Sequence, residues 1–339
     1  MENQINSTNK ISYELIAQKQ LPQISSCNAI AIETKNSIVV IAEESRIIIY
    51  SFKYHSLKKI KQFKINSGNI NTLNFFKHRQ NFISGCQNSS IYIWPINMIM
   101  TSKYIQKLKA NSGSTLCLCI SKSEDQVVTG HYQNTIKIWS QIEQNSQEWS
   151  CLQNLVDHTG AVYGLSMSEY QNKIISCSND QQVLVYQFSQ HYCKWILQQI
   201  IQKDGLRLCF ITNDIFVFQP YAANYLSIYI FEVRSEKFIS TEKVQIQEGG
   251  QFCNEFFPCI YNPKKGIIFT KSSYNLNILN CKFQQDFLFK EQQLIEIILN
   301  DVIDFGDEYF CGSISDDGEY LFIWNNELKE ISIRKYKEE

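Results

Sequence analysis

The chain has 339 residues, which is too long for one ordinary β-sandwich, and no Pro/Gly-rich linker divides it, so we expect one large repeat domain. Lys and Arg total 32 against 33 Asp and Glu, and the formal charge of -1 excludes an overall basic field that would attract nucleic acid. The longest apolar runs are only about five residues, far short of the roughly 18 that a membrane-spanning helix needs, so no membrane insertion is expected.

The twelve cysteines do not form the pattern of a disulfide scaffold. They are spread one to three per repeat, and most lie inside apolar runs. The N-terminal sequence M-E-N-Q-I-N-S-T-N-K also lacks the layout of a signal peptide. We therefore expect free thiols in a reducing, cytoplasmic environment. Residues 1–10 are predicted to be a disordered tail, and residues 11–339 a single domain.

The ordered part of the chain is predicted to consist of short strands. Residues 11–19 alternate apolar and polar positions, which predicts a lone strand before the first repeat. Groups of strands separated by polar turns follow. β-Branched and aromatic residues dominate these groups, which favours strands over helices. We place six groups at residues 25–66, 67–111, 112–158, 159–202, 203–246 and 247–304, and a seventh closes the chain.

Three of these groups share a clear internal pattern. Residues 129–140 read T-G-H-Y-Q-N-T-I-K-I-W-S, a strand end, a polar turn and an alternating second strand. Residues 84–95 and 176–187 repeat it as S-G-C-Q-N-S-S-I-Y-I-W-P and S-C-S-N-D-Q-Q-V-L-V-Y-Q. The closing aromatics, Trp94, Trp139 and Tyr186, stand 45 and 47 residues apart.

This spacing and pattern resemble the WD-repeat (G-protein β-subunit-like) family of β-propellers. In the fourth group, His158, Ser176, Asp180 and Tyr186 occupy positions at which this family has a hydrogen-bonded His, Ser, Asp and aromatic. The resemblance implies that these four residues tie the blade together. Tyr186 replaces the usual Trp, and the Trp-Asp dipeptide that names the family is absent throughout.

The last group determines the predicted closure of the fold. Residues 315–324 read as a turn and a second strand, and residues 330–336 as a third, so this group is one strand short. The spare strand at residues 11–19 can fill the gap and remove an exposed edge. The sequence therefore predicts an all-β, seven-bladed β-propeller of four-stranded antiparallel blades, with the last blade closed by the N-terminal strand.

Motifs for chemistry are sparse. Cys117 and Cys119 have no C-x-x-C or H-x-x-x-H partner, so neither a metal nor a cofactor is expected. No Gly-rich phosphate-binding motif occurs. A hydrolase that uses His158 and Asp180 with Ser176 is the enzymatic alternative. The absence of a G-x-S-x-G elbow and the position of Ser176 within a core strand favour a structural network, so we expect no enzyme and no small-molecule substrate.

The predicted function is a non-catalytic protein-protein interaction scaffold or adaptor subunit of a multiprotein complex, with other proteins as partners. In a propeller, variable loops on a rigid ring converge on one face. A narrower alternative is that residues 148–158, E-W-S-C-L-Q-N-L-V-D-H, are similar to the propeller subunit that targets iron-sulfur clusters to cytosolic client proteins. The candidate docking residues are Tyr132, Gln133, Thr159, Asp180, Tyr221, Asn224 and Tyr274.

Overall fold

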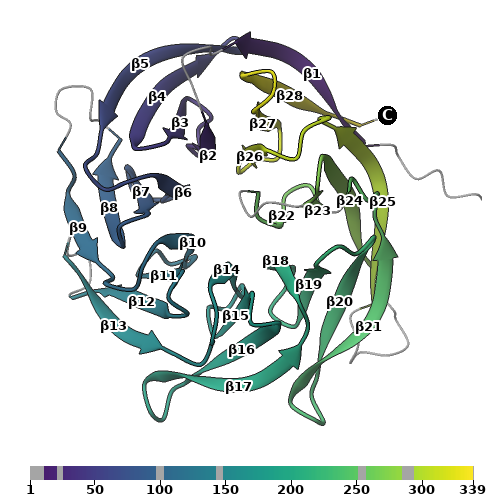
Figure 1. Ribbon diagram of the computed structural model, residues 1–339. Helices are drawn as coiled ribbons and strands as arrows, with labels where there is room; N and C mark the ends of the chain where they lie inside the picture. The colour runs from purple at the N-terminus through teal and green to yellow at the C-terminus, as the bar shows by residue number, and fades with distance from the viewer. Residues whose placement is uncertain are drawn as a thin grey trace, which may run out of the picture.

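The computed structural model describes residues 11–20, 26–96, 103–142, 148–250, 257–284 and 294–338. The predicted N-terminal tail, residues 1–10, lies outside these ranges. The described chain folds into seven four-stranded antiparallel sheets arranged as blades around a central axis (Figure 1). The predicted all-β, seven-bladed propeller is therefore confirmed.

The first four blades follow the chain in order from the inner strand to the outer strand. Their turns carry the Gly, Asn, Asp and Ser residues that tight turns favour. Blade 1 contains β2 (Cys27–Ile32), β3 (Ile38–Glu43), β4 (Arg46–Lys53) and β5 (Ser56–Lys64), and blade 2 contains β6 (Ile70–Phe75), β7 (Asn81–Cys86), β8 (Ser90–Pro95) and β9 (Gln106–Lys109). Blade 3 contains β10 (Thr115–Ile120), β11 (Gln126–His131), β12 (Ile136–Gln141) and β13 (Trp149–Leu155), and blade 4 contains β14 (Val162–Met167), β15 (Lys173–Ser178), β16 (Gln182–Ser189) and β17 (Lys194–Gln202).

Blades 5 and 6 repeat this order, and blade 7 takes its outer strand from the other end of the chain. Blade 5 contains β18 (Gly205–Phe210), β19 (Ile215–Pro220), β20 (Tyr225–Glu232) and β21 (Lys237–Gln245). Blade 6 contains β22 (Ile260–Asn262), β23 (Ile267–Ser272), β24 (Asn275–Gln284) and β25 (Leu294–Asp304). Blade 7 contains β26 (Phe310–Ile314), β27 (Tyr320–Asn325), β28 (Glu330–Glu338) and, as its outer strand, β1 (Ile11–Gln20).

The pairing of β1 with β28 closes the ring, as predicted. It runs antiparallel from Ile11 opposite Glu338 to Gln20 opposite Glu330, with a bulge between Leu15 and Ala17. Because β1 completes the sheet, the last blade has four strands like the others. The two ends of the chain are thus held in one sheet.

The core is divided into seven apolar clusters, one at each joint between neighbouring blades. Strand β3 explains how: Val39 and Ile41 face blade 7, whereas Val40 and Ala42 face blade 2. Successive side chains point to opposite faces of a strand, and here both faces are covered. The second strands are therefore buried along most of their length, and each blade is packed from both sides.

Candidate docking face and central channel

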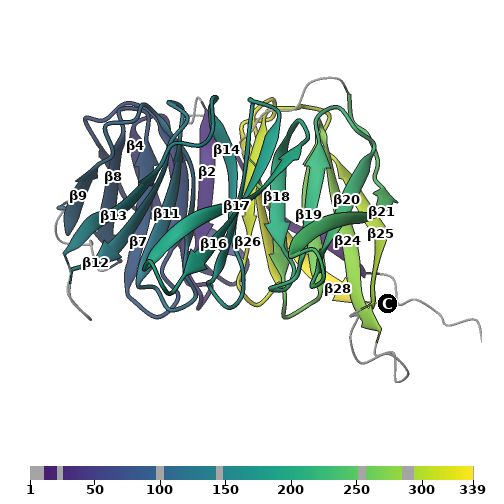
Figure 2. The ribbon, with the colours of Figure 1, turned by 90° about the horizontal axis from the view of Figure 1, so that it is seen from below.

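The strand order defines two faces of the disc, which are seen from the side in Figure 2. The second and fourth strands of a blade run in the same direction, since all pairs are antiparallel. The turn between the second and third strands therefore lies on the same face as the loop to the next blade. We call this the upper face, and we call the face with the remaining turns, first to second and third to fourth strand, the lower face.

All seven candidate docking residues lie on the upper face. They occupy the turns β11–β12, β15–β16, β19–β20 and β23–β24 and the loop β13–β14. Three of them are exposed tyrosines: Tyr132 is 62% exposed, Tyr221 is 44% exposed and Tyr274 is 36% exposed. Gln133, Thr159 and Asn224 are exposed as well. The upper face thus presents aromatic rings among neutral polar groups.

Asp180 differs from the other six. Its side chain is only 3% exposed, because the carboxylate points into the blade. Oδ2 accepts a hydrogen bond from the Thr159 backbone N–H at 2.9 Å, and Oδ1 accepts one from the Gln182 N–H at 3.0 Å. Asp180 therefore fixes the shape of the upper face and offers little of its own surface to a partner.

The same carboxylate binds the buried His158. Oδ2 of Asp180 lies 2.7 Å from Nδ1 of His158, and Nε2 of His158 lies 2.8 Å from Oγ of Ser176. Burial lowers the pKa of His158 below its usual value, and it outweighs the Asp180 hydrogen bond and charge, which act to raise that pKa. The imidazole is therefore neutral near pH 7, with Nδ1–H donating to Asp180 and Nε2 accepting from the Ser176 hydroxyl.

Tyr186 is placed apart from this chain of hydrogen bonds. Its hydroxyl donates to Oδ2 of Asp157 at 3.1 Å. In blades 2 and 3 the corresponding tryptophans donate instead from the indole, Trp94 Nε1 to Ser84 Oγ and Trp139 Nε1 to Thr129 Oγ1, each at 2.9 Å. The hydroxyl of a tyrosine lies at the far end of its ring. The Tyr186 hydroxyl therefore reaches Asp157 in the loop before the blade, and not a side chain of the neighbouring strand.

Ser176, His158 and Asp180, the residues of the hydrolase alternative, are enclosed within the blade. Ser176 is 0% exposed and His158 is 1% exposed. A substrate carbonyl would have to reach the Ser176 hydroxyl through the packed blade. These three residues are arranged to satisfy each other's polar groups in a buried site, where unpaired ones are costly.

Blade 3 contains a second network that was not predicted. Nε2 of the fully buried His131 lies 2.9 Å from Oγ1 of Thr129, and Nδ1 lies 3.5 Å from Oγ1 of Thr115. Burial, with a smaller effect of the Lys137 charge, lowers the pKa of His131 to about 3. The T-G-H tripeptide at residues 129–131 was the available signal, but this histidine lies in a strand rather than in the loop before the blade.

Two further exposed side chains on the upper face were missed. Tyr309 lies in the loop between β25 and β26, and Leu328 lies in the turn between β27 and β28; both are more than half exposed. They belong to the last blade, where the turn sequence carries no repeat-like signal. They extend the exposed apolar surface around the ring.

The inner strands surround a cavity of about 320 Å³. Of its described lining residues, Lys77, Arg207 and Asp316 are the charged ones. Arg207 is 3% exposed, and its Nε donates to the Phe257 carbonyl at 2.7 Å. Asp316 and Lys77 lie in turns between first and second strands, so they stand at the lower mouth of this channel.

Neither a grouped set of metal ligands nor a membrane-spanning helix is found among the described residues. No three His, Cys, Asp or Glu side chains in these ranges are grouped so that they could hold a metal ion. No described helix is long and apolar enough to cross a membrane.

Comparison with protein families gives three matches along the chain. The family model described as "WD domain, G-beta repeat" matches residues 57–95, 102–140 and 149–187. Each match ends one residue beyond Trp94, Trp139 or Tyr186, the three aromatics that define the repeat. Each also spans two blades, from the region of one outer strand through three strands of the next blade.

Similar proteins cover only part of the chain. Striatin-3 of Rattus norvegicus and that of Mus musculus are each 26% identical over 112 residues, 29% of this chain and 14% of the relative. Striatin-3 of Homo sapiens is 25% identical over 118 residues, 31% of this chain and 15% of the relative. The match therefore spans about a seventh of the length of these relatives.

Similarity in structure extends over the whole domain. A chain in "Crystal Structure of Mitotic Checkpoint Complex" has a TM-score of 0.71 and 12% identity, covering 95% of this chain and 94% of that one. At this identity the likeness concerns the fold alone. With the closed ring of seven blades and the three matched repeats, the chain is a seven-bladed β-propeller that contains three WD repeats.

Proposed function

We propose that this chain is a non-catalytic protein-interaction scaffold or adaptor subunit of a multiprotein complex, and that it docks its partner on the upper face. The exposed tyrosines on that face carry the proposal. Tyr132, Tyr221 and Tyr274 project from three different blades that the closed ring holds in fixed positions. Tyrosine supplies large contact area at low cost in side-chain entropy, and it is enriched among residues that dominate binding energy.

The surroundings of the tyrosines support a protein partner. Gln133, Thr159 and Asn224 offer uncharged hydrogen-bonding groups next to the rings. Apolar anchors among neutral polar groups are typical of the central part of a protein interface, where charged residues are depleted. The enclosed Ser176, His158 and Asp180 support a non-catalytic role, because they already satisfy one another. A cytoplasmic location remains a prediction from the sequence.

The iron-sulfur targeting alternative gains no specific support. The passage at residues 148–158 forms the outer strand β13, and packing accounts for its most distinctive residue. The Trp149 ring lies 6.0 Å from the Phe76 ring, and the Arg79 guanidinium carbon lies 5.8 Å from the Trp149 ring centre. A buried tryptophan with these contacts is explained by the blade 2–blade 3 joint.

The test compares two triple variants in quantitative affinity purification from native lysate. The first is Tyr132→Ala with Tyr221→Ala and Tyr274→Ala on the upper face. The second is a matched control on the lower face, where Tyr54, Tyr170 and Tyr192 are all more than 60% exposed. We expect the upper-face variant to lose specific co-purifying proteins that the wild type and the lower-face control retain. Equal retention by both variants would contradict docking on the upper face.

A further inference from the structure

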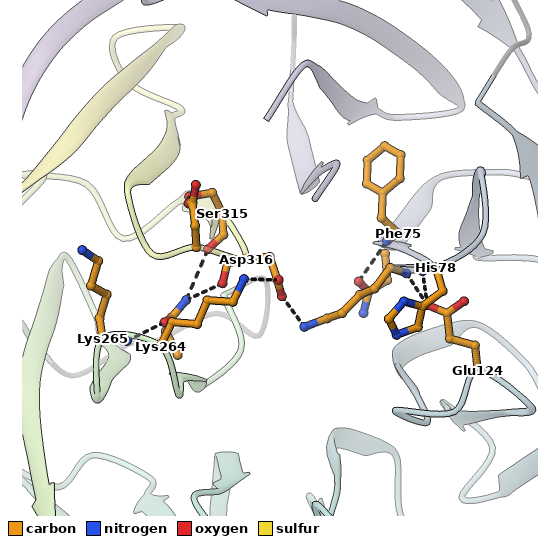
Figure 3. Close-up of polar contacts among 11 residues, drawn as sticks. Phe75, His78, Glu124, Lys264, Lys265, Ser315 and Asp316 are labelled. Atoms are coloured by element: carbon orange, nitrogen blue, oxygen red, sulfur yellow. Dashed lines mark hydrogen bonds and ion pairs between the residues drawn. The ribbon is translucent and has the colours of Figure 1, made fainter. Parts of the chain in front are cut away.

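The lower mouth of the channel carries a convergent group of charges that is separate from the upper face. Nζ of Lys264 lies 3.0 Å from Oδ2 of Asp316, and Nζ of Lys77 contacts Oδ1 of the same carboxylate. Figure 3 shows the side chains of Lys264 and Asp316 meeting at the mouth, whereas Lys265 points away. Two lysines thus bind different oxygens of one carboxylate.

The three side chains come from three blades. Lys77 follows β6 in blade 2, Lys264 lies between β22 and β23 in blade 6, and Asp316 follows β26 in blade 7. Lys77 and Asp316 are 239 residues apart in sequence, and blade 1 lies between their blades in the ring. The ring geometry alone brings these groups to one point.

The backbone on both sides of the mouth is held in place. The Lys77 and His78 N–H groups both donate to Oε1 of Glu124 in blade 3. On the other side, Nδ2 of the buried Asn262 donates to the Ser315 and Asp316 carbonyls at 3.3 and 3.2 Å. Neighbouring blades therefore hold the backbone of the turns that carry Lys77 and Asp316.

Lys264 is the more exposed member of a lysine pair. The adjacent Lys265 is bound to Oε1 of Glu319 at 2.6 Å, and its Nζ lies 3.9 Å from the Tyr336 ring centre. The Lys264 side chain is 58% exposed and that of Lys77 is 59% exposed, whereas that of Asp316 is only 23% exposed. The two ammonium groups can reach a ligand from solvent while the carboxylate sits between them.

The three side chains at the lower mouth carry a net positive charge. Lys77 and Lys264 place two positive charges beside the single carboxylate of Asp316. Burial acts to raise the pKa of Asp316, but the hydrogen bonds and charges of Lys77 and Lys264 outweigh it and hold that pKa below its usual range. Asp316 is therefore ionised, and it leaves an excess of positive charge.

We propose that this mouth is an anion site in which Lys77 and Lys264 bind a phosphate group of a small ligand, and that Asp316 occupies the site in the free protein. Lysine is a mobile point charge with three donors, well suited to phosphate oxygens. A phosphate offers more oxygens and more charge than the carboxylate that the two lysines already bracket. The cavity behind the mouth, about 320 Å³, leaves room for the rest of the ligand.

No contiguous sequence motif predicts this phosphate site. Gly-rich phosphate loops use backbone N–H groups from one stretch of chain, whereas here three distant turns supply side chains. The proposal does not depend on protein docking, because the mouth lies on the lower face. A failure of either idea therefore leaves the other standing.

The test titrates the full chain and its variants with inorganic pyrophosphate by isothermal calorimetry at low ionic strength. Asp316→Asn removes the competing anion, and we expect it to bind pyrophosphate at least about tenfold more tightly than wild type. Lys77→Gln combined with Lys264→Gln keeps the aliphatic stems and should weaken binding by at least about tenfold. Circular dichroism and melting temperature check that each variant is folded.

Lys122→Gln is the matched control. Lys122 lies on the same lower face, and its Nζ pairs with Oε1 of Glu169 at 3.2 Å, both side chains being exposed. This variant removes one positive charge away from the mouth and should leave the affinity for pyrophosphate unchanged. The proposal is overturned if Asp316→Asn fails to bind pyrophosphate more tightly, or if Lys122→Gln weakens binding as much as Lys77→Gln combined with Lys264→Gln. Equal binding of succinate would overturn the assignment to phosphate.

Discussion

Tyr13 offers a direct test of ring closure. It is the third residue of β1 and is 2% exposed. Its ring makes edge contacts with Phe269 of blade 6 at 5.4 Å and with Tyr336 of β28 at 5.8 Å, and its hydroxyl donates to the Gly318 carbonyl at 2.6 Å. One side chain therefore joins the N-terminal strand to both of the last two blades.

Tyr13→Ala should destabilise the whole domain. Removing a buried aromatic ring costs about 3–5 kcal/mol, since the transfer free energy is lost and a cavity remains. An unfolding entropy of about 2.1 cal/mol/K per residue gives about 0.7 kcal/mol/K for a chain of this length, if the ring unfolds as a unit. The expected fall in melting temperature is then about 4–7 °C, which differential scanning calorimetry resolves.

Two variants separate the contributions. Tyr13→Phe keeps the ring and loses only the bond to Gly318, so we expect a loss of about 1 kcal/mol and a shift of about 1–2 °C. Leu15→Ala alters an exposed position of the same strand, which is 44% exposed, and should change stability by less than about 0.5 kcal/mol. If Tyr13→Ala lowered the melting temperature no more than Leu15→Ala, the reasoning that β1 closes the ring would be refuted.

Three further predictions concern the blades. His158→Ala should cost about 3 kcal/mol in the free energy of unfolding, because it leaves buried partners unpaired; denaturant unfolding measures it, and an unchanged midpoint would contradict a structural network. His131 has a pKa of about 3 in the folded state and about 6.5 when unfolded, so the unfolded state binds more protons between these values. Stability should fall by about 1.4 kcal/mol per unit as pH drops below about 6.5, and His131→Gln should flatten this slope; an equal slope in both proteins would exclude His131 as the cause. Gly130→Ala would place a Cβ 2.6 Å from Cys117 Sγ and 2.8 Å from a Val162 methyl, and calorimetry should show a loss of about 1–3 kcal/mol; a variant as stable as wild type would mean that this joint can expand.

The sequence alone was sufficient for the architecture, because strands, turns and repeats are local signals. Apolar runs ended by small and aromatic residues recur every 45 to 47 residues, and this period specifies the blade. The strands predicted for the last blade were one short of four. The segment at residues 11–19 was predicted to be the missing strand. The inner strands of every blade are covered on both faces. Their apolar pattern is therefore strong even in blades where the family motif is weak.

The network around His158 was predictable only in part. The resemblance to the WD-repeat family implied that His158, Ser176 and Asp180 are in contact, and the structure has these contacts. The direction of Tyr186 toward Asp157 was not predictable, because it depends on how far the phenol hydroxyl reaches in the folded blade. Asp180 was expected on the surface, but the hydrogen bonds that it accepts turn it inward.

The charged side chains at the lower mouth of the channel come together only in the tertiary structure. Lys77, Lys264 and Asp316 each look like an ordinary charged turn residue in the sequence, with no spacing that relates them. They meet because closing seven twisted sheets into a ring brings the turns of separate blades together around one axis. Periodicity describes what each blade contains, whereas contacts across the ring depend on the angle and number of blades, which only the closed structure defines.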